Sequence, residues 1–318
     1  MKQYLSDFSK LIKFRLSFTV VFSASISFLI GQKMQIGRSQ DPAWVKKMVS
    51  LGETDIVHTI NWGNWLILIA GGFLVTAAAN CFNEIIEKDL DKLMSRTKDR
   101  PMPAGRMTTG QGLILGVFMA FLGTWLLGHL NLETGLLSVF SILLYAFAYT
   151  PLKRKSPIAV FVGAIPGALP PLIGYLAAFG SLKSEMFYAI DYNIAVILFL
   201  IQFVWQFPHF WAIAWVLDDD YKKAGFRLLP TKKRDKTSAL LTFLSTLILI
   251  PVSLLPTIYG FGGYYIAGLS LIAGLIFSWL AFKLLMNREL IDAKKVMFCS
   301  FFYIPAVQLG LLLNFIAK

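Results

Sequence analysis

The sequence NEIIEKDLDKLMSRTKDRPMPAG, residues 83–105, follows a long apolar run and has an acidic half followed by a basic half. In the acidic half, Asn83, Glu87 and Asp91 are spaced four residues apart, and Glu84 flanks them. Four residues advance an α-helix by about 400°, so the three side chains drift by only about 80° and share one face. A face of this kind, at the end of a membrane-spanning helix, can hold a hard divalent cation through oxygen ligands.

The basic half supplies Arg96, Lys98, Arg100 and Arg106 within one short stretch. Guanidinium groups bind phosphate oxygens in a bidentate way, so acids followed by arginines suit a diphosphate–metal complex. The alternative is a solvated loop with salt bridges and ordinary positive charge beside a membrane span. Spacing alone leaves both interpretations open.

Composition indicates a membrane protein. Apolar residues make up 56% of the 318 positions and charged residues 15%, and the mean hydropathy is +0.64. Long apolar stretches recur along the whole chain, which is typical of an all-α polytopic membrane protein. Since no Ser- or Gly-rich linker divides it, we expect a single domain over residues 1–318. Nine membrane-spanning helices are expected, at residues 14–33, 64–86, 111–130, 133–150, 157–179, 193–217, 238–257, 262–284 and 296–317.

The lysines and arginines are distributed unevenly between the two ends of these spans. Of the 30, 24 lie toward one end of the spans, that is, in or next to the N-terminal segment and the connections after spans two, four, six and eight. The other six are Lys33, Arg38, Lys46, Lys47, Lys183 and Lys318. The positive-inside rule then predicts a cytoplasmic N-terminus and an external C-terminus. We expect the membrane itself to be a bacterial inner membrane. The net charge of +12 therefore requires no nucleic-acid partner.

A second acidic group, Asp218-Asp219-Asp220, ends the sixth span and precedes Lys222 and Lys223. Because it falls on the same membrane face as the first group, the two could cooperate around one polyanion and its metal ions. Asp219 and Asp220 are the candidate ligands here. The alternative is a solvated helix end.

The connection after span four, Tyr149–Lys155, adds Lys153 and Arg154 to the same face as candidate phosphate-binding residues. Span five then contains Pro166, Pro170 and Pro171, which must bend or unwind the helix. Irregular backbone at membrane depth is tolerated only where it is buried in protein or lines a cavity. We therefore expect a central cavity that opens toward the cytoplasmic side.

The sixth span has a polar and aromatic segment that should face the protein interior. Its candidate binding residues are Gln202, Trp205, Gln206, His209 and Trp211. At 1.5 Å per residue, His209 lies about 15 Å from Asp219, a depth suited to the far end of a large ligand. A packing histidine beside Pro208 is the competing interpretation.

These segments resemble the UbiA superfamily of intramembrane prenyltransferases. The first motif is Asn83-x3-Glu87-x3-Asp91 followed by RTKDRP and Gly105. More narrowly, DLDKLMSRTKDRP, YTPLKRKSP, AIPGALPPLIG, QFPHFWAIAW and DDYKKAGFRLLP resemble the protoheme IX farnesyltransferase branch, in the same order, over roughly residues 75–235. Glu87 stands where the family usually has Asp, which keeps the charge and lengthens the reach. The second motif also departs from the superfamily, being DDDY rather than its wider-spaced pattern.

The resemblance implies a nine-helix bundle and a reaction in which farnesyl diphosphate alkylates a vinyl group of heme b and water adds, giving heme O. It implies Mg²⁺ held by Asn83, Glu87 and Asp91, with a second ion at Asp219 and Asp220. It assigns diphosphate binding to Arg96, Lys98, Arg100, Lys153 and Arg154, and heme and prenyl binding to the segment of the sixth span. It also implies a hand-off of product to a heme A synthase or a terminal oxidase.

Three other functions compete with this one. A prenyltransferase acting on a quinone-precursor aromatic acid would carry more acids around span six, where this chain has Pro208-His209-Phe210-Trp211. A secondary transporter would place its acids near mid-membrane rather than at one face. A structural subunit of a respiratory complex would leave the paired acids and bases unexplained.

Overall fold

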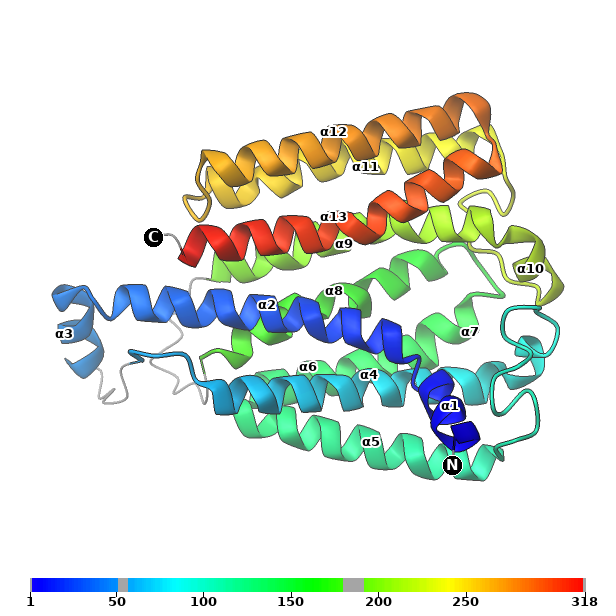
Figure 1. Cartoon of the computed structure of the whole chain (residues 1–318), viewed down its shortest axis with the longest axis horizontal. Coiled ribbons are helices and arrows are strands. Elements are labelled where there is room, and N and C mark those ends of the chain that lie inside the picture. Colours follow the sequence, from blue (N-terminus) through cyan, green and yellow to red (C-terminus); the bar gives the residue numbers. More distant parts are fainter. Residues whose placement is uncertain (1, 51–56, 180–191, 317–318) are drawn as a thin grey trace.

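The computed structural model describes residues 2–50, 57–179 and 192–316 as a bundle of helices, with no strand in these ranges (Figure 1). Nine helical runs within them are long and apolar enough to cross a membrane. They are α2 (Phe14–Arg38), α4 (Trp62–Asp91), α5 (Thr109–Leu130), the α6–η1–α7 run (Leu132–Leu152), α8 (Ala159–Ala177), α9 (Tyr192–Val216), α11 (Lys236–Ile258), α12 (Tyr264–Asn287) and α13 (Leu290–Ile316). The predicted integral, multi-pass membrane architecture is confirmed.

Short helices occupy the ends of the bundle: α1 (Lys2–Leu11), α3 (Pro42–Ser50) and α10 (Asp218–Lys223). The fourth span is continuous but changes type, from α6 (Leu132–Leu143) through the π-helix η1 (Leu144–Tyr149) to α7 (Thr150–Leu152). The largest differences from the expected boundaries are six residues at the start of α13, which begins at Leu290 instead of residue 296, and five residues at the ends of α2 and α4, which run to Arg38 and Asp91.

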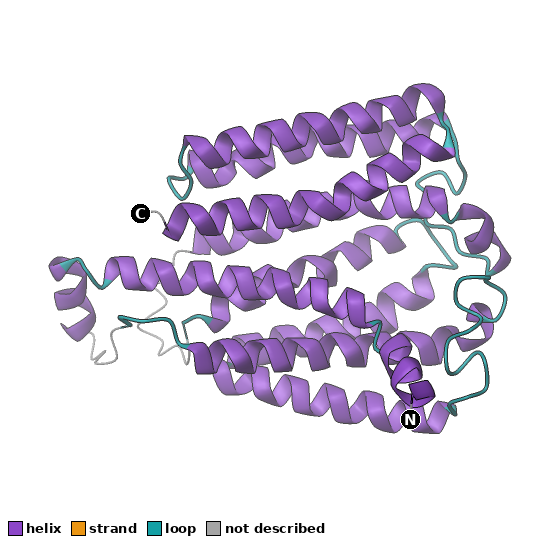
Figure 2. Ribbon diagram, in the orientation of Figure 1, coloured by secondary structure: helices purple, strands orange, loops and turns teal. Residues whose placement is uncertain are grey.

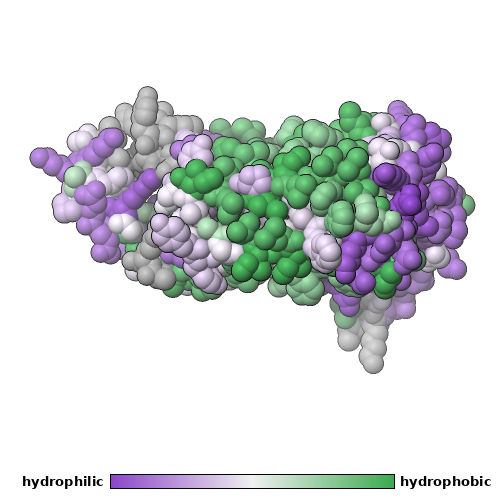
Figure 3. Space-filling model, turned by 90° about the horizontal axis from the view of Figure 1, so that it is seen from above, coloured by the Kyte–Doolittle hydropathy of each residue, from purple (hydrophilic) through white to green (hydrophobic). Residues whose placement is uncertain are grey.

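The outer surface carries large apolar side chains in a band between two polar ends (Figure 3). On α5, for example, Ile114 is 73% exposed and Phe121 is 68% exposed. Such residues would be costly in water, and they are suited to contact with lipid chains.

Small residues let the helices approach closely, as is common in membrane bundles. A Cβ added to Gly174 of α8 would lie 1.9 Å from the carbonyl oxygen of Ala24 in α2, so only glycine fits there. Gly71 of α4 and Gly123 of α5 meet in the same way, with the backbone of each within about 3.1 Å of a Cβ on the other. The helix α8 packs against α2, α6 and α9 and so lies inside the bundle.

Of the two expected effects of the prolines, bending or unwinding, the fifth span does not unwind, because α8 is helical from Ala159 to Ala177 with all three inside it. The N–H that Pro171 lacks would have bonded the carbonyl of Gly167. Gln202 of α9 replaces it, donating from Nε2 to Gly167 O at 2.8 Å. A neighbouring helix thus satisfies the carbonyl that proline leaves free.

The N-terminal helix α1, α7, α10, and the connections after α4 and α12 gather at one end of the bundle (Figures 1 and 2). The basic connections predicted to share one membrane face therefore do so. Lys183 and Lys318 lie outside the described residues. This charged end holds the candidate site.

Candidate functional site

The acidic face of α4 points into the protein. Asn83, Glu87 and Asp91 are at most 3% exposed, as is the flanking Glu84. Their burial follows from the helix continuing unbroken to Asp91, which keeps the four-residue spacing in register. The predicted shared face is confirmed, and each of its members has a specific partner.

Glu87 is paired with Lys153, which the chain supplies just beyond α7. Lys153 Nζ lies 2.9 Å from Glu87 Oε1 and 3.2 Å from Oε2, and Asn83 Nδ2 donates to Oε2 at 2.9 Å. The ammonium also lies over the rings of Tyr149 and Phe226, at 4.7 and 5.5 Å from their centroids. Burial opposes protonation, but Glu87 outweighs it and raises the pKa of Lys153. The Lys153 ammonium is therefore a cation held in place by Glu87 and by two aromatic rings.

The π-helix η1 turns this segment toward α4. The backbone N–H of Thr150 donates to the carbonyl of Tyr145, five residues earlier, and Pro151 follows with no N–H to donate. As a result, Thr150 Oγ1 accepts from Asn83 Nδ2 at 3.0 Å. The neighbouring Tyr149 packs closely against α8, where a Cβ added to Gly163 would lie 2.7 Å from the Tyr149 ring. A π-helix at a functional site is a recurrent arrangement.

Asp91 is paired with Arg100, which returns from the loop after α4. Arg100 Nη1 donates to Asp91 Oδ2 at 2.6 Å, and Thr97 Oγ1 donates to Asp91 O at 3.0 Å. Asp91 Oδ1 is buried without a hydrogen-bond partner among the described residues. One oxygen of this carboxylate therefore remains available to a cation.

Sequence reasoning missed Lys13, which joins α1 to α2. Its Nζ donates to Asn83 Oδ1 at 2.7 Å. Its backbone is in the left-handed region, with φ 47° and ψ 58°, an uncommon conformation for lysine. Burial, and then the nearby cations of Arg100 and Lys153, lower the pKa of Lys13 well below its usual value. A lone lysine before an apolar run carries no pattern that would have identified it.

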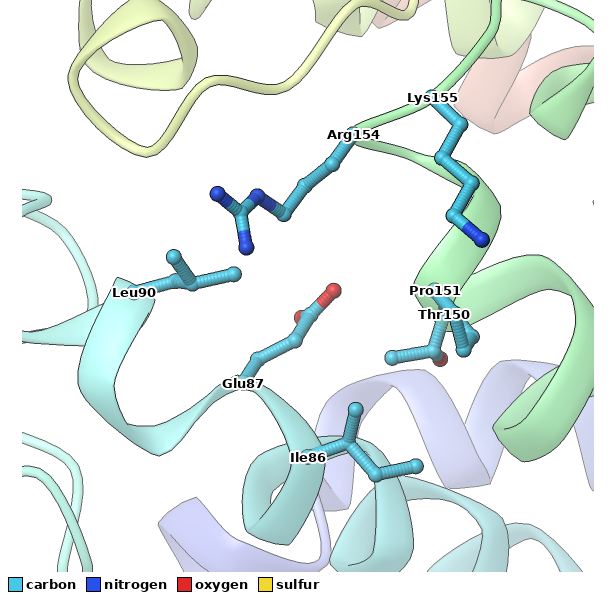
Figure 4. Close-up of a pocket in the computed structure, with 7 residues that line it drawn as sticks. All are labelled: Ile86, Glu87, Leu90, Thr150, Pro151, Arg154 and Lys155. Atoms are coloured by element: carbon cyan, nitrogen blue, oxygen red, sulfur yellow. The ribbon is translucent and has the colours of Figure 1, made fainter.

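A cleft of about 430 Å³ lies beside Glu87. It is lined by Ile86, Glu87, Leu90, Thr150, Pro151, Arg154 and Lys155. Figure 4 shows the Glu87 carboxylate pointing toward the space between Arg154 and Lys155. Arg154 was predicted here, whereas Lys155 was not singled out as a site residue. The cleft is formed by α4, α7 and the two residues Arg154 and Lys155, and no residue of α8 lines it, so it is not the central cavity that the fifth span led us to expect.

The loop after α4 does not present all its bases to this cleft. Arg96 and Lys98 are exposed. The backbone of this loop is held by Asp220, which accepts from Ser95 N at 2.9 Å, Ser95 Oγ at 2.8 Å and Arg96 N at 3.2 Å. Asp220 therefore joins α10 to the loop that carries Arg100.

The three acids of α10 have separate surroundings. Asp218 is buried and lies 2.7 Å from Lys222 Nζ. Asp219 has a side chain that is 77% exposed and accepts from Arg234 Nη1 at 3.0 Å. None of the three lines the cleft beside Glu87.

The five candidates on α9 face two different neighbours. Gln202 and Gln206 are buried toward α8, where a Cβ on Gly167 would lie 2.2 Å from Gln206 Nε2. Gln202 Oε1 also accepts from Ser23 Oγ of α2 at 2.7 Å and from Gln308 Nε2 of α13 at 3.0 Å. These contacts give Gln202 a structural role that the sequence did not suggest.

Two members of the group, Trp205 and His209, face α13. The rings of Trp205 and His209 stack with centroids 4.3 Å apart, and both bond to Ser300. Ser300 Oγ donates to the carbonyl of Met297, so His209 Nδ1 is the donor to Ser300 Oγ and Nε2 keeps its lone pair. Trp211 packs on Phe207, with centroids 5.5 Å apart.

The acidic face of α4 fits a divalent cation that is shared with a ligand. Within the described residues, no group of three or more His, Cys, Asp or Glu side chains could hold a metal ion alone. Mg²⁺ commonly takes only one or two protein carboxylates, with phosphate and water completing its shell. The unpartnered Asp91 Oδ1 and the neighbouring Glu87 and Asn83 suit that mode of binding.

Comparison with known proteins points the same way. The sequence profile of the UbiA prenyltransferase family matches residues 57–303. A protoheme IX farnesyltransferase of Cytophaga hutchinsonii is 39% identical over 316 residues, covering 99% of each chain. One of Aquifex aeolicus is 37% identical over 245 residues, covering 76% of this chain and 80% of the relative.

Solved structures share the fold at low sequence identity. A digeranylgeranylglyceryl phosphate synthase superposes with a TM-score of 0.75 at 21% identity, covering 100% of each chain. A UbiA homolog from Archaeoglobus fulgidus, bound to DMAPP and Mg²⁺, superposes with a TM-score of 0.59 at 13% identity, covering 96% of this chain and 99% of the other.

Proposed function

Because the chain belongs to the UbiA prenyltransferase family, with close relatives named protoheme IX farnesyltransferase, we propose that it transfers the farnesyl group of farnesyl diphosphate to heme b. The C1–O bond of farnesyl diphosphate breaks and its electron pair leaves with the diphosphate. A vinyl group of heme b supplies the electrons of the new C–C bond. Water adds to the resulting cation and loses a proton, giving the hydroxyethylfarnesyl group of heme O.

The observation that carries this proposal is the pairing of acids with bases on the inner face of α4. Lys153 and Arg100 are fixed within 3 Å of Glu87 and Asp91 respectively, inside the protein. Preorganised cations of this kind stabilise the charge that develops on a leaving diphosphate. Arg154, Arg96 and Lys98 are exposed around the same end and would draw the polyanion in.

Asn83, Glu87 and Asp91 would hold Mg²⁺, which, when bound, neutralises part of the diphosphate charge. Lys153 and Arg100, which are paired with Glu87 and Asp91, would bind the phosphate oxygens. Asp219 is the better candidate for a second ion, since its carboxylate is exposed whereas both oxygens of Asp220 already accept hydrogen bonds.

The aromatic side of α9 would hold the far part of the substrates. Trp205, Phe207 and Trp211 present rings that stabilise an allylic cation without attacking it. His209 Nε2, left with its lone pair by the bond to Ser300, would contact heme. In this scheme Gln202 and Gln206 keep α9 and α8 together around the site.

The purified protein tests the proposal when it is supplied with farnesyl diphosphate, Mg²⁺ and either heme b or a hydroxybenzoate-type acid. We expect heme O, detected by mass, and inorganic diphosphate in equal amounts. Prenylation of the aromatic acid alone would instead assign the chain to quinone biosynthesis. Omission of Mg²⁺ should abolish product formation in either case.

We also propose that the charged end faces the cytoplasm in a bacterial inner membrane, where heme O would pass to a heme A synthase or a terminal oxidase. The carrier of this proposal is the gathering of the basic connections at one end of the bundle (Figure 1). A cysteine at Lys233 should be protected from an impermeant maleimide in intact cells, while one at Lys46 should react. The reverse pattern would place the site outside.

A further inference from the structure

The helix α1 is held on the loop between α4 and α5 by Arg106, which bonds Asp7, and by Lys10, whose Nζ lies 2.5 Å from Asp99 Oδ2. Arg106 Nε lies 3.1 and 3.0 Å from the two carboxylate oxygens of Asp7, and Nη2 donates to Asp7 Oδ1 at 2.9 Å. Nη2 and Nη1 also donate to Asp99, to its carbonyl at 2.8 Å and to its carboxylate at 3.2 Å. The Arg106 side chain is 29% exposed and that of Asp7 is 10% exposed, so the pair is partly shielded from water.

These contacts use four of the five N–H groups of the Arg106 guanidinium. The Nε–Nη2 edge of Arg106 faces Asp7 and its Nη1–Nη2 edge faces Asp99, so neither edge is available for a bidentate contact with a phosphate. Although Arg106 belongs to the basic stretch after α4, its geometry separates it from Arg100, which reaches the acidic face of α4.

Lys13 lies two residues beyond the end of α1, directly before α2. Leu11 and Ile12 are buried, and the carbonyl of Ile12 accepts from Ser17 Oγ at 2.7 Å and from Asn80 Nδ2 at 3.3 Å. Lys13 follows in a left-handed conformation that a lysine adopts only where its surroundings impose it. The junction therefore transmits the position of α1 to the Lys13 amine, which bonds Asn83 Oδ1.

We propose that Arg106 is a positioning residue, which by gripping Asp7 holds α1 on the loop and thereby fixes the Lys13 amine in the diphosphate site. The inference rests on the proposed function for the nature of the ligand. It assigns Lys13 as a binding residue and gives Arg106 no contact with the substrate.

Equilibrium binding of farnesyl diphosphate with Mg²⁺, without heme, measures the effect apart from turnover. Lys13→Met and Arg106→Gln should each weaken binding by about tenfold, the loss of one charge-assisted contact. Asp7→Asn should weaken it similarly, although it removes a negative charge. Lys236→Gln, which removes an exposed positive charge at the same end of the bundle, is the matched control and should bind normally.

A thermodynamic cycle and a proteolysis assay separate positioning from direct contact. In the Lys13→Met background, Arg106→Gln should weaken binding less than twofold further, because both changes remove the same contact. Trypsin should cleave after Lys10 faster in Arg106→Gln and Asp7→Asn than in Lys236→Gln. Arg106→Lys should recover part of the affinity.

Additive losses in the cycle, or unchanged binding by Asp7→Asn, would overturn the positioning role while leaving the proposed function intact. Unchanged trypsin cleavage after Lys10 in both Arg106→Gln and Asp7→Asn would overturn the positioning role as well. If the wild-type chain failed to bind farnesyl diphosphate, the proposed function would fall and this assignment with it.

Discussion

Two acidic groups lie at the same end of the bundle, and they are built differently. On α4, the carboxylates of Glu87 and Asp91 are buried, and each faces a base: Glu87 faces Lys153, 66 residues further along the chain, and Asp91 faces Arg100 of the loop that follows α4. On α10, a helix of six residues, Asp219 is exposed and pairs with Arg234. Asp220 holds backbone amides of the loop that follows α4.

The difference shows that local charge pattern does not determine a carboxylate's role. An ion pair sheltered from water retains much of its Coulomb energy, and removing either partner leaves a costly buried charge. An exposed pair such as Asp219–Arg234 contributes little. The α4 group can therefore exchange its bases for a bound anion with a large effect, whereas the α10 group mainly organises a loop.

The largest expected effect comes from neutralising the α4 acids. Glu87→Gln and Asp91→Asn should each lower kcat by about 10²- to 10³-fold, because the charge that positions the metal–diphosphate complex is lost. Steady-state turnover at saturating Mg²⁺ measures this. Asp89→Asn, whose side chain is 72% exposed beside Lys92, is the control and should stay within a few-fold of wild type. Near-normal turnover in Glu87→Gln would remove the distinction between the two groups.

The next effect tests whether the pair is as strongly coupled as its burial indicates. Lys153→Gln should lower both activity and stability, with about 3–5 kcal/mol lost because Glu87 is left buried without its partner. Adding Glu87→Gln should restore most of the thermal stability and none of the activity. Thermal unfolding in detergent provides the measurement, and simple additivity of the two losses in stability would contradict the coupling.

A smaller effect is expected at Asp220, through the loop rather than the chemistry. Asp220→Asn should increase trypsin cleavage at Arg96 and Lys98 by about three- to tenfold, because the loop loses charge-assisted hydrogen bonds. Turnover should fall less than in either α4 variant. If turnover fell as far as in Glu87→Gln with the loop still protected, Asp220 would belong with the metal ligands.

The hydrogen bonds by which Asp220 holds this loop should also depend on pH. Burial acts to raise the pKa of Asp220, but hydrogen bonds from Ser95, Lys223 and Arg96 lower it overall, well below the usual value. A lowered pKa stabilises the folded form above the unfolded value of about 4, and this contribution is lost as pH falls toward the folded pKa. Loop protection should therefore be constant from pH 5 to 8 and decline below about pH 4 in wild type, with a weaker decline in Asp220→Asn.

The smallest effect is expected at Asp219. Asp219→Asn should change kcat by less than about threefold, since an exposed pair contributes little. Its informative readout is the Mg²⁺ concentration that gives half-maximal rate. A rise in that concentration would support a second ion at Asp219, while an unchanged value would confine metal binding to α4.

Much of this architecture could be predicted from the sequence. Apolar length identified all nine membrane-spanning helices found in the described ranges, and four-residue spacing placed Asn83, Glu87 and Asp91 on one buried face. Both features depend on short-range periodicity, which sequence records directly. The bases Arg100 and Lys153 were also identified, because each lies in a distinctive motif.

The features that could not be predicted depend on contacts between distant segments. Lys13 reaches the site only because α1 is held against the loop near Arg106 and the backbone adopts a left-handed conformation. The π-helix depends on where η1 meets α4, and the polar groups of Gln202 are used by Gly167, Ser23 and Gln308. A polar side chain within an apolar span indicated that Gln202 faces inward. Its partners could not be predicted, because they come from three other helices.

Those partners make the region around Gln202 a point where several helices are joined within the membrane. Four helices, α2, α8, α9 and α13, are tied there by amide and hydroxyl groups, each bond contributing on the order of 0.6–2 kcal/mol in an apolar medium. Farther from the charged end, the contact of Gly174 with Ala24 leaves α2 and α8 no room to slide. Movement of α2 against α8 is therefore restrained at two neighbouring depths, by hydrogen bonds around Gln202 and by close backbone packing at Gly174.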